Sequence, residues 1–384
     1  MIFHFRRRFA AVFVVLCAAL LLSGCGQSAG IYRNYRAVED LQIVQTLGID
    51  LEPDGLITVT AAAAKAGDSA APAVLSRSAK SLPEALAALQ EFSQRGQLFF
   101  AHIQYLLLGQ AAAEYGLEPV FDYVERDIHT RMGTDLFLIR DSSAKELMSA
   151  LADGEKISEL LASVKRDTEL QGGSRVDSLR AAAVALGEYG AAAVCALRLT
   201  DGSDGILSDP PVLTALPDGY GILRDGSLVC FLDGEDAEIL GLLTGTGGTL
   251  RRSVSDGEGC TVTLELSGGA DFSMESPSRL KAAVHADAAI AAVTAAGAQI
   301  TDPETRQRLA DALAAELNTS AERVLSLSKT LDADFLPLAP VLRRHTDHPL
   351  PADWLQELEF QVETEVTPTH SYDLSDPPDM EETK

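Results

Sequence analysis

Few residues of this 384-residue chain have types and spacings that could do chemistry, and histidine is the first to test. In His345-Thr-Asp-His348, two histidines lie at a spacing loosely suited to a metal ion. Because this segment sits among prolines, we expect a solvated loop rather than a ligand set. His102 lies in an apolar run, where a hydrogen-bonded core histidine is a better interpretation than a catalytic base.

Two patterns typical of enzymes are missing or incomplete. No Gly-x-Ser-x-Gly elbow is present, so a hydrolase interpretation lacks its nucleophile. Gly245-Thr-Gly-Gly248 is rich in glycine, but no Lys-Ser/Thr pair follows it and no dinucleotide-binding strand precedes it. We therefore predict a loop there, and the sequence predicts no catalytic residue, no metal site and no cofactor.

Three cysteines remain in the body of the chain: Cys195, Cys230 and Cys260. Each lies in or beside a predicted strand, and a buried small hydrophobic residue is the simplest interpretation. An odd number leaves at least one thiol free or paired between chains. A 195–230, 195–260 or 230–260 disulfide stays open.

Arg126-Asp127, followed by Arg131, is the densest polar cluster of the first half of the chain. An ion-pair network that closes a helix is the favoured interpretation, and a recognition site for a partner is the alternative. The cluster lacks the neighbours that would tune a pKa for acid–base catalysis.

The amino-terminal segment carries the clearest signal for a chemical modification. Arg6, Arg7 and Arg8 precede an uncharged apolar run from Phe9 to Leu22, which is too short to span a bilayer but typical of a signal peptide. The run ends in Leu22-Ser-Gly-Cys25, which resembles the bacterial lipobox. We expect Cys25 to receive a diacylglyceryl group and to become the mature amino terminus, although an ordinary secretory signal is the alternative.

Charge narrows the choice of partners. The chain has a net charge of −25, and loss of residues 1–24 removes three arginines and no acid, which makes it −28. Such a body is not expected to bind nucleic acid or an anionic lipid surface electrostatically. Two acyl chains on Cys25 would anchor it stably. No other segment reaches 18 consecutive apolar residues, so we expect no membrane span in the mature chain.

The elements that must position these residues can be predicted in the first half. We expect strands at 41–51, 56–64, 98–108 and 135–139, the third of them buried on both faces. Capping boxes at Ser81 and Ser143 each open a helix. A broken helix is expected over 110–126 and another over 176–186.

In the second half we expect a 220–232 hairpin, a helix over 235–243, and strands at 260–266, 280–293 and 358–366. A long helix follows Asp302-Pro303 and carries one apolar stripe, which we expect to pack on a sheet. Its members are Leu309, Leu313, Leu317, Val324, Leu327 and Leu331.

Taken together, the sequence predicts an α+β (mixed), three-domain lipoprotein whose mixed sheets are flanked by helices. The predicted parts are a lipoprotein signal peptide (1–24), a lipidated linker (25–30), an N-terminal mixed α/β domain (31–190), a small α+β middle domain (191–267), a C-terminal α+β domain (268–372) with a long helix (303–331), and an acidic disordered tail (373–384).

In this order the pieces resemble the C subunit of bacterial spore germinant receptors, the Ger(x)C lipoprotein family. Each motif alone is weak, and their order carries the resemblance. The motifs are the lipobox, Glu39–Asp50 with its terminal Gly-Ile-Asp, Ser81-Leu-Pro-Glu-Ala-Leu86, Leu98–Gly109 with its internal His102, Phe121–Asp127 with Arg131, Tyr220–Leu243, Asp334-Phe335 and Trp354.

The resemblance implies a non-catalytic, lipid-anchored subunit on the outer face of the cell or spore inner membrane. It would assemble with two polytopic membrane subunits into a nutrient receptor that triggers spore germination. The resemblance transfers only Cys25 as a functional residue. A solute-binding lipoprotein of a nutrient transporter is the second hypothesis, and a lipid-anchored envelope enzyme is the third.

Overall fold

The computed structural model describes residues 41–63, 73–92, 97–126, 131–151, 154–200, 214–232, 234–255, 261–293, 303–346 and 348–369. The predicted signal peptide (1–24), the linker (25–30) with Cys25, and the tail (373–384) lie outside these residues. Asp127 and Cys260 also lie outside them.

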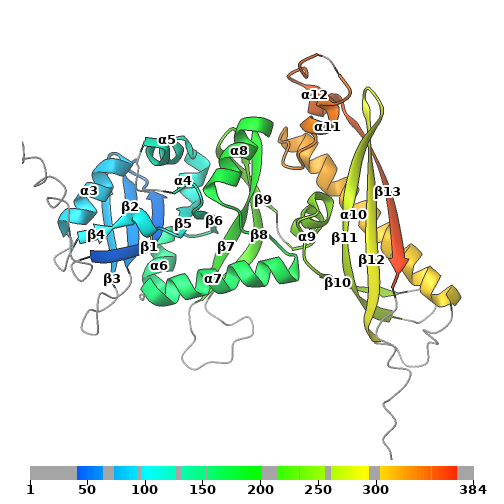
Figure 1. Ribbon diagram of the computed structural model, residues 1–384, viewed down its shortest axis with the longest axis horizontal. Coiled ribbons are helices and arrows are strands. Elements are labelled where there is room, and N and C mark those ends of the chain that lie inside the picture. The colour runs from blue at the N-terminus through cyan, green and yellow to red at the C-terminus, as the bar shows by residue number, and fades with distance from the viewer. Residues whose placement is uncertain are drawn as a thin grey trace, which may run out of the picture.

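The first sheet has nine strands in the order β3-β2-β1-β5-β6-β7-β8-β9, and β4 also pairs with β1 (Figure 1). β1, β5, β6 and β7 run parallel, while the β1–β2–β3 and β7–β8–β9 segments are antiparallel. The strands are β1 (Leu41–Leu51), β2 (Ile57–Ala63), β3 (Ala73–Ala79), β4 (Gln97–Phe99), β5 (Tyr105–Gly109), β6 (Asp135–Arg140), β7 (Ala191–Thr200), β8 (Thr214–Arg224) and β9 (Ser227–Leu232).

Helices cover both faces of this sheet (Figure 1). One face packs against α3 (Leu82–Phe92), α4 (Gln110–Tyr115), α5 (Glu118–Arg126) and α8 (Leu179–Tyr189). The other face packs against α6 (Ala144–Leu151) and α7 (Gly154–Gln171). The central strands are therefore apolar at nearly every position, because neither side chain direction leads to water.

The second sheet has four strands and one long helix. Its order is β10 (Leu250–Ser255), β11 (Thr261–Ser276), β12 (Arg279–Val293) and β13 (Glu359–Pro368), with only β12–β13 parallel. The helix α10 (Pro303–Leu331) runs along this sheet, and its predicted apolar stripe packs into the same core (Figure 1). Two short helices, α11 (Ala339–Arg343) and α12 (Trp354–Glu357), complete this half. Since both sheets mix parallel and antiparallel pairs, the predicted α+β (mixed) class is confirmed.

The residues predicted as a middle domain, 191–267, have no sheet of their own within the described part of the chain. β7, β8 and β9 extend the first sheet, whereas β10 and β11 open the second. Between them lies α9 (Gly234–Thr244), which is buried on almost every side and packs against both halves. The division into three independently folding domains stays a prediction. The hydrogen-bonded strands form two sheets, and α9 lies between them in the sequence.

The prediction of one continuous strand over 98–108 is wrong, because a turn separates β4 from β5. β4 and β5 both pair with β1, but Ile43 faces Phe99 while Thr46 faces Tyr105, so three extra residues stand between the two registers. They form a 3₁₀ turn, Phe100–His102. His102 is consequently exposed, and the expectation of a core histidine is wrong.

Most other predicted elements are confirmed within a few residues. Both predicted helix starts are confirmed, with the Ser81 and Ser143 hydroxyls accepting from the backbone N–H groups of Glu84 and Glu146 at 3.4 and 3.0 Å. α4 and α5 separate at Gly116, whose φ of 126° suits only glycine. The sequence did not predict β3 or α7, and α8 begins at Leu179, after its N-cap Ser178.

Candidate functional site at the junction of the two halves

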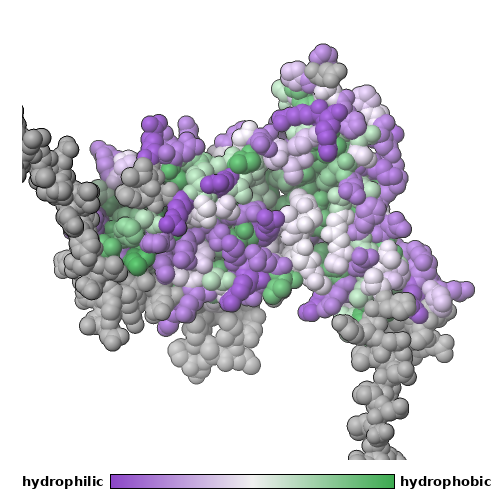
Figure 2. Space-filling model, in the orientation of Figure 1, coloured by the Kyte–Doolittle hydropathy of each residue, from purple (hydrophilic) through white to green (hydrophobic). Residues whose placement is uncertain are grey.

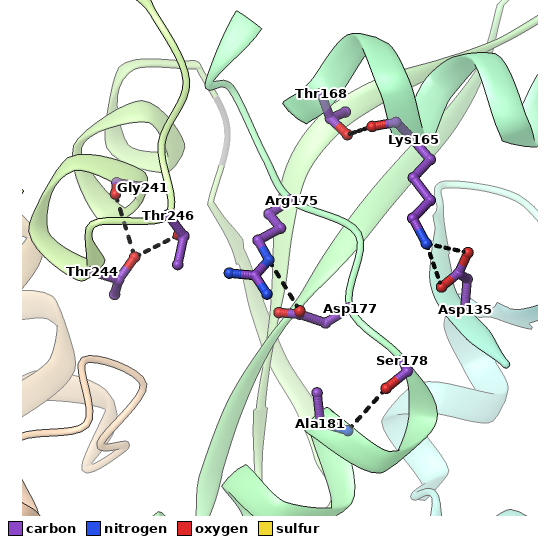
Figure 3. A network of polar contacts seen from close by, with 10 residues as sticks. All are labelled: Asp135, Lys165, Thr168, Arg175, Asp177, Ser178, Ala181, Gly241, Thr244 and Thr246. Carbon is purple, nitrogen blue, oxygen red and sulfur yellow. Dashed lines mark hydrogen bonds and ion pairs between the residues drawn. The ribbon is translucent and has the colours of Figure 1, made fainter. Parts of the chain in front are cut away.

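Polar side chains gather where α7, α8 and α9 approach one another (Figure 3). Asp135 opens β6, and both of its carboxylate oxygens accept from Lys165 Nζ of α7, at 3.0 and 2.9 Å. This contact raises the pKa of Lys165. The pair ties the start of a parallel strand to the helix that covers it.

The segment before α8 supplies a second ion pair. Arg175 Nε lies 3.2 Å from Asp177 Oδ1, and Ser178 caps α8 by accepting from Ala181 N at 3.3 Å (Figure 3). Burial raises the pKa of Asp177, and Arg175 opposes this by favouring the charged carboxylate. Asp177 is therefore a half-buried carboxylate that pairs with Arg175, and Lys165 also favours its charged form while Asp135 disfavours it.

The glycine-rich 245–248 segment forms a loop, as predicted, and the structure shows why it needs glycine. A Cβ on Gly248 would lie 2.7 Å from Leu170 O, so the end of α9 can approach α7 only without side chains there. Within the same turn, the hydroxyl oxygens of Thr244 and Thr246 lie 2.7 Å apart (Figure 3). The segment serves close packing between the halves.

A cavity of about 220 Å³ adjoins this network. Tyr220 lies in its wall, and its hydroxyl bonds to the Arg175 backbone and to Thr246, while burial raises the pKa of Tyr220. The lining comprises Asp177, Ala181, Ala182, Ala185, Tyr189, Ala191, Ala192, Ala193, Tyr220, Leu240, Thr244, Thr246, Asp334, Phe335 and Pro337. Residues from both halves therefore share one cavity.

Two buried aspartates, one in each half, act as helix caps. Asp50 at the end of β1 accepts from Ala144 N and Lys145 N of α6, at 2.7 and 2.8 Å. Asp334 accepts from Leu338 N and Ala339 N of α11, at 2.7 and 2.8 Å. Burial raises the pKa of both carboxyls, and the backbone donors oppose that rise.

Both aspartates belong to motifs of the family resemblance, but the sequence predicted no role for either of them. A role for Asp50 is indicated by two of these motifs, since Glu39–Asp50 ends with this aspartate and Leu98–Gly109 ends with a glycine. A Cβ on Gly109 would overlap Asp50 Oδ1, so these two strand ends are fitted to each other. Because the Ala144 and Lys145 N–H groups at the amino terminus of α6 already donate to Asp50, they are not available to bind a phosphate.

The predicted cluster at Arg126 is brought together only in part. Arg126 Nε donates to Asp122 Oδ1 at 2.7 Å within α5, and both side chains are exposed. Arg131 is exposed too, while Asp127 lies outside the described residues. Arg126 also borders a groove of about 780 Å³, together with Tyr115 and Tyr123.

The histidines and cysteines form no reactive group in the described part of the chain. His345 and His348 are exposed, as expected of a solvated loop. No group of three or more His, Cys, Asp or Glu residues there could hold a metal ion. Cys195 and Cys230 are free thiols, so the 195–230 disulfide is excluded. Burial raises the pKa of Cys195 to about 12, which makes it a poor nucleophile.

With this geometry in hand, comparison with known proteins decides the family. Residues 34–194 match the model of the spore germination protein N-terminal domain, and residues 218–371 match that of the spore germination B3/GerAC-like C-terminal domain. The chain belongs to the spore germination GerAC family. The resemblance to the C subunit of spore germinant receptors is thereby confirmed.

A solved structure supports the fold. The crystal structure of the GerBC protein matches with a TM-score of 0.51 and 15% sequence identity, covering 84% of this chain and 96% of that chain. No curated protein matched the sequence. Among the described helices, none is both long and apolar enough to cross a membrane.

Proposed function

We propose that this family member is a non-catalytic lipoprotein subunit of a nutrient germinant receptor. It is anchored by acyl chains on Cys25 and assembles with two polytopic membrane subunits on the outer face of the cell or spore inner membrane. The observation that carries this proposal is the match of both family domains in order, from residue 34 to residue 371.

The side-chain chemistry of the described residues supports a role without catalysis. The two most buried carboxylates, Asp50 and Asp334, each spend both oxygens on backbone N–H groups. Cys195 is fully buried, and its pKa is raised far above the range of a thiolate nucleophile. The hydrogen bonds and burial of these groups stabilise the fold.

Charge supports a requirement for protein partners. A mature body of net charge −28 is repelled by anionic headgroups, so the acyl chains supply attachment but not a fixed orientation. Contacts with membrane subunits would hold the protein against that repulsion. The proposal therefore expects a complex that survives detergent extraction.

Affinity purification of the tagged full-length protein from detergent-solubilised spore inner membrane tests this directly. We expect two polytopic membrane proteins in comparable amounts, identified by mass spectrometry. A permease with an ATPase would instead support the solute-binding lipoprotein, and no partner at all would contradict receptor assembly.

Cys25→Ala tests the anchor separately. The variant should lose fatty-acid labelling and either leave the membrane fraction or accumulate as an uncleaved precursor. Cys230→Ala is a matched control, since it removes a half-buried thiol without touching the lipobox. Normal labelling of Cys25→Ala would contradict lipidation at this residue.

A further inference from the structure

The cavity at the junction has the features of a small-molecule site. Its walls come from α8, β7 and β8 on one side and from α9 and the 333–337 segment on the other. Ligand cavities commonly lie between packed parts of a protein, with apolar walls and a few polar groups. Its volume of about 220 Å³ lies below the roughly 300–1,000 Å³ of pockets for drug-sized ligands, so only a smaller molecule fits.

Small side chains create this space. Ala181, Ala182 and Ala185 line it from α8, and Ala191–Ala193 line it from β7. Leu240 and Phe335 close the opposite side. A short aliphatic body can therefore lie on the alanine wall, and any longer side chain at these alanines would occupy the same volume.

The polar groups of the lining favour a cation. Asp177 and Asp334 contribute carboxylates from the two halves, and none of the described lining residues is Lys, Arg or His. Arg175 contacts Asp177 at Oδ1, and Lys165 also favours the charged form of Asp177. Asp334 accepts from two backbone donors, and Arg343 favours its charged form. Burial penalises both negative charges and raises the pKa of each, so an added positive charge nearby would be favourable.

Hydroxyl groups add acceptors beside the carboxylates. The oxygens of Tyr220, Thr244 and Thr246 belong to the same lining and are linked by hydrogen bonds. An ammonium group has three donors and no acceptor, so it suits a site that offers carboxylate and hydroxyl oxygens. A neutral alcohol of the same length would lack the charge that these carboxylates favour.

We propose that the junction cavity binds a small primary ammonium compound with a short aliphatic body. The ammonium group lies toward Asp177 and the hydroxyls, and the body lies on the alanines of α8 and β7. Because residues of both halves touch the ligand, binding also strengthens their contact. The inference does not depend on assembly with membrane subunits, since binding is measured on this chain alone.

Isothermal titration of the full-length protein in detergent, with n-butylamine hydrochloride and 1-butanol as probes, tests the proposal. We expect saturable binding of butylammonium with a Kd of roughly 1–10 mM, and at least about tenfold weaker binding of butanol. Asp177→Asn should remove that preference. Asp141→Asn is the matched control, because this exposed aspartate lies outside the cavity lining and should leave binding unchanged.

A second variant keeps the test decisive if Asp177→Asn does not fold. Ala185→Leu should fill the cavity and weaken binding of both probes at least about tenfold, while circular dichroism shows a native fold. Equal affinities for butylammonium and butanol would overturn the proposal that the cavity prefers a positively charged ligand. Unchanged binding in a folded Ala185→Leu protein, or no saturable binding below about 100 mM, would overturn the site itself.

Discussion

The two sheets of this protein bury their residues in different ways. In β6, the four consecutive residues Leu136–Ile139 are all 0% exposed, because helices cover both faces of the first sheet. In β12, Leu280, Ala282 and Val284 are buried, whereas Lys281, Ala283 and His285 between them are not. The second sheet packs against α10, and the alternate residues of β12 and β13 that point away from this core are half-buried or exposed. Figure 2 shows hydrophilic residues along the right-hand edge of this half.

This difference indicates which positions of each sheet can tolerate substitution. A strand covered on both faces has no position that is free of packing, so its sequence is restricted at every residue. A strand covered on one face alternates between restricted and free positions. Four predictions follow this contrast from its largest expected effect to its smallest.

Consecutive truncations give the largest effect. The side chains of Leu138 and Ile139 point to opposite faces of β6, and both are buried. Leu138→Ala and Ile139→Ala should therefore each lower the free energy of unfolding by roughly 2–5 kcal/mol. In β12 only one member of the matched pair should be costly, with Val284→Ala destabilising and His285→Ala nearly neutral. Urea unfolding followed by circular dichroism measures all four, and equal costs for Val284→Ala and His285→Ala would break the comparison.

Substitutions at Asp50 and Gly109 test whether the stability of the first half depends on the close contact between these two residues. Gly109→Ala places a Cβ against Asp50 Oδ1 and should cost about 1–3 kcal/mol. Asp50→Ala leaves Ala144 N and Lys145 N without their acceptor and should cost about 1.5–3 kcal/mol.

In the double variant the overlap disappears, so its cost should be smaller than the sum of the two single costs. Gly133→Ala is the control, since no atom lies within 4 Å of a Cβ built there. Strict additivity of the two costs would show that Asp50 and Gly109 do not contact each other in solution.

The two buried caps predict a pH dependence shared by both halves. Burial raises the pKa of Asp50 and Asp334 above the unfolded value near 3.8. Between the unfolded and folded pKa values the native state holds more protons, so its stability falls as pH rises through that window.

Asp50→Asn and Asp334→Asn remove one such carboxyl each, so the stability advantage of the wild type over either variant should shrink as pH rises from about 4. Urea midpoints measured across pH report the trend. An advantage that grows over this range would mean that the backbone donors, rather than burial, control the carboxyl concerned.

Surface pairs on the open face of the second sheet should matter least. Arg251 contacts Glu265 at 2.7 Å, but its side chain is 73% exposed. Arg251→Ala should cost only about 0–1 kcal/mol, and less as salt is added. Thermal unfolding at low and high ionic strength measures this, and a large, salt-independent loss would reveal a second covered face.

The elements whose signals are local could be predicted from the sequence alone. Alternation predicted β12 and β13, capping boxes predicted α3 and α6, and the leucine stripe predicted the buried face of α10. Each signal depends on neighbours within a few residues along the chain. The family resemblance likewise came from the order of short motifs, and the family models confirmed it.

The remaining features could not be predicted from the sequence, because they depend on contacts between residues that are far apart along the chain. The apolar run 98–108 predicted one strand, yet the register of β1 splits it and exposes His102. Asp50 became a cap because the end of β1 meets α6, which starts 94 residues later. The junction cavity, with Asp177 and Asp334 in one lining, likewise exists only where the two halves pack together.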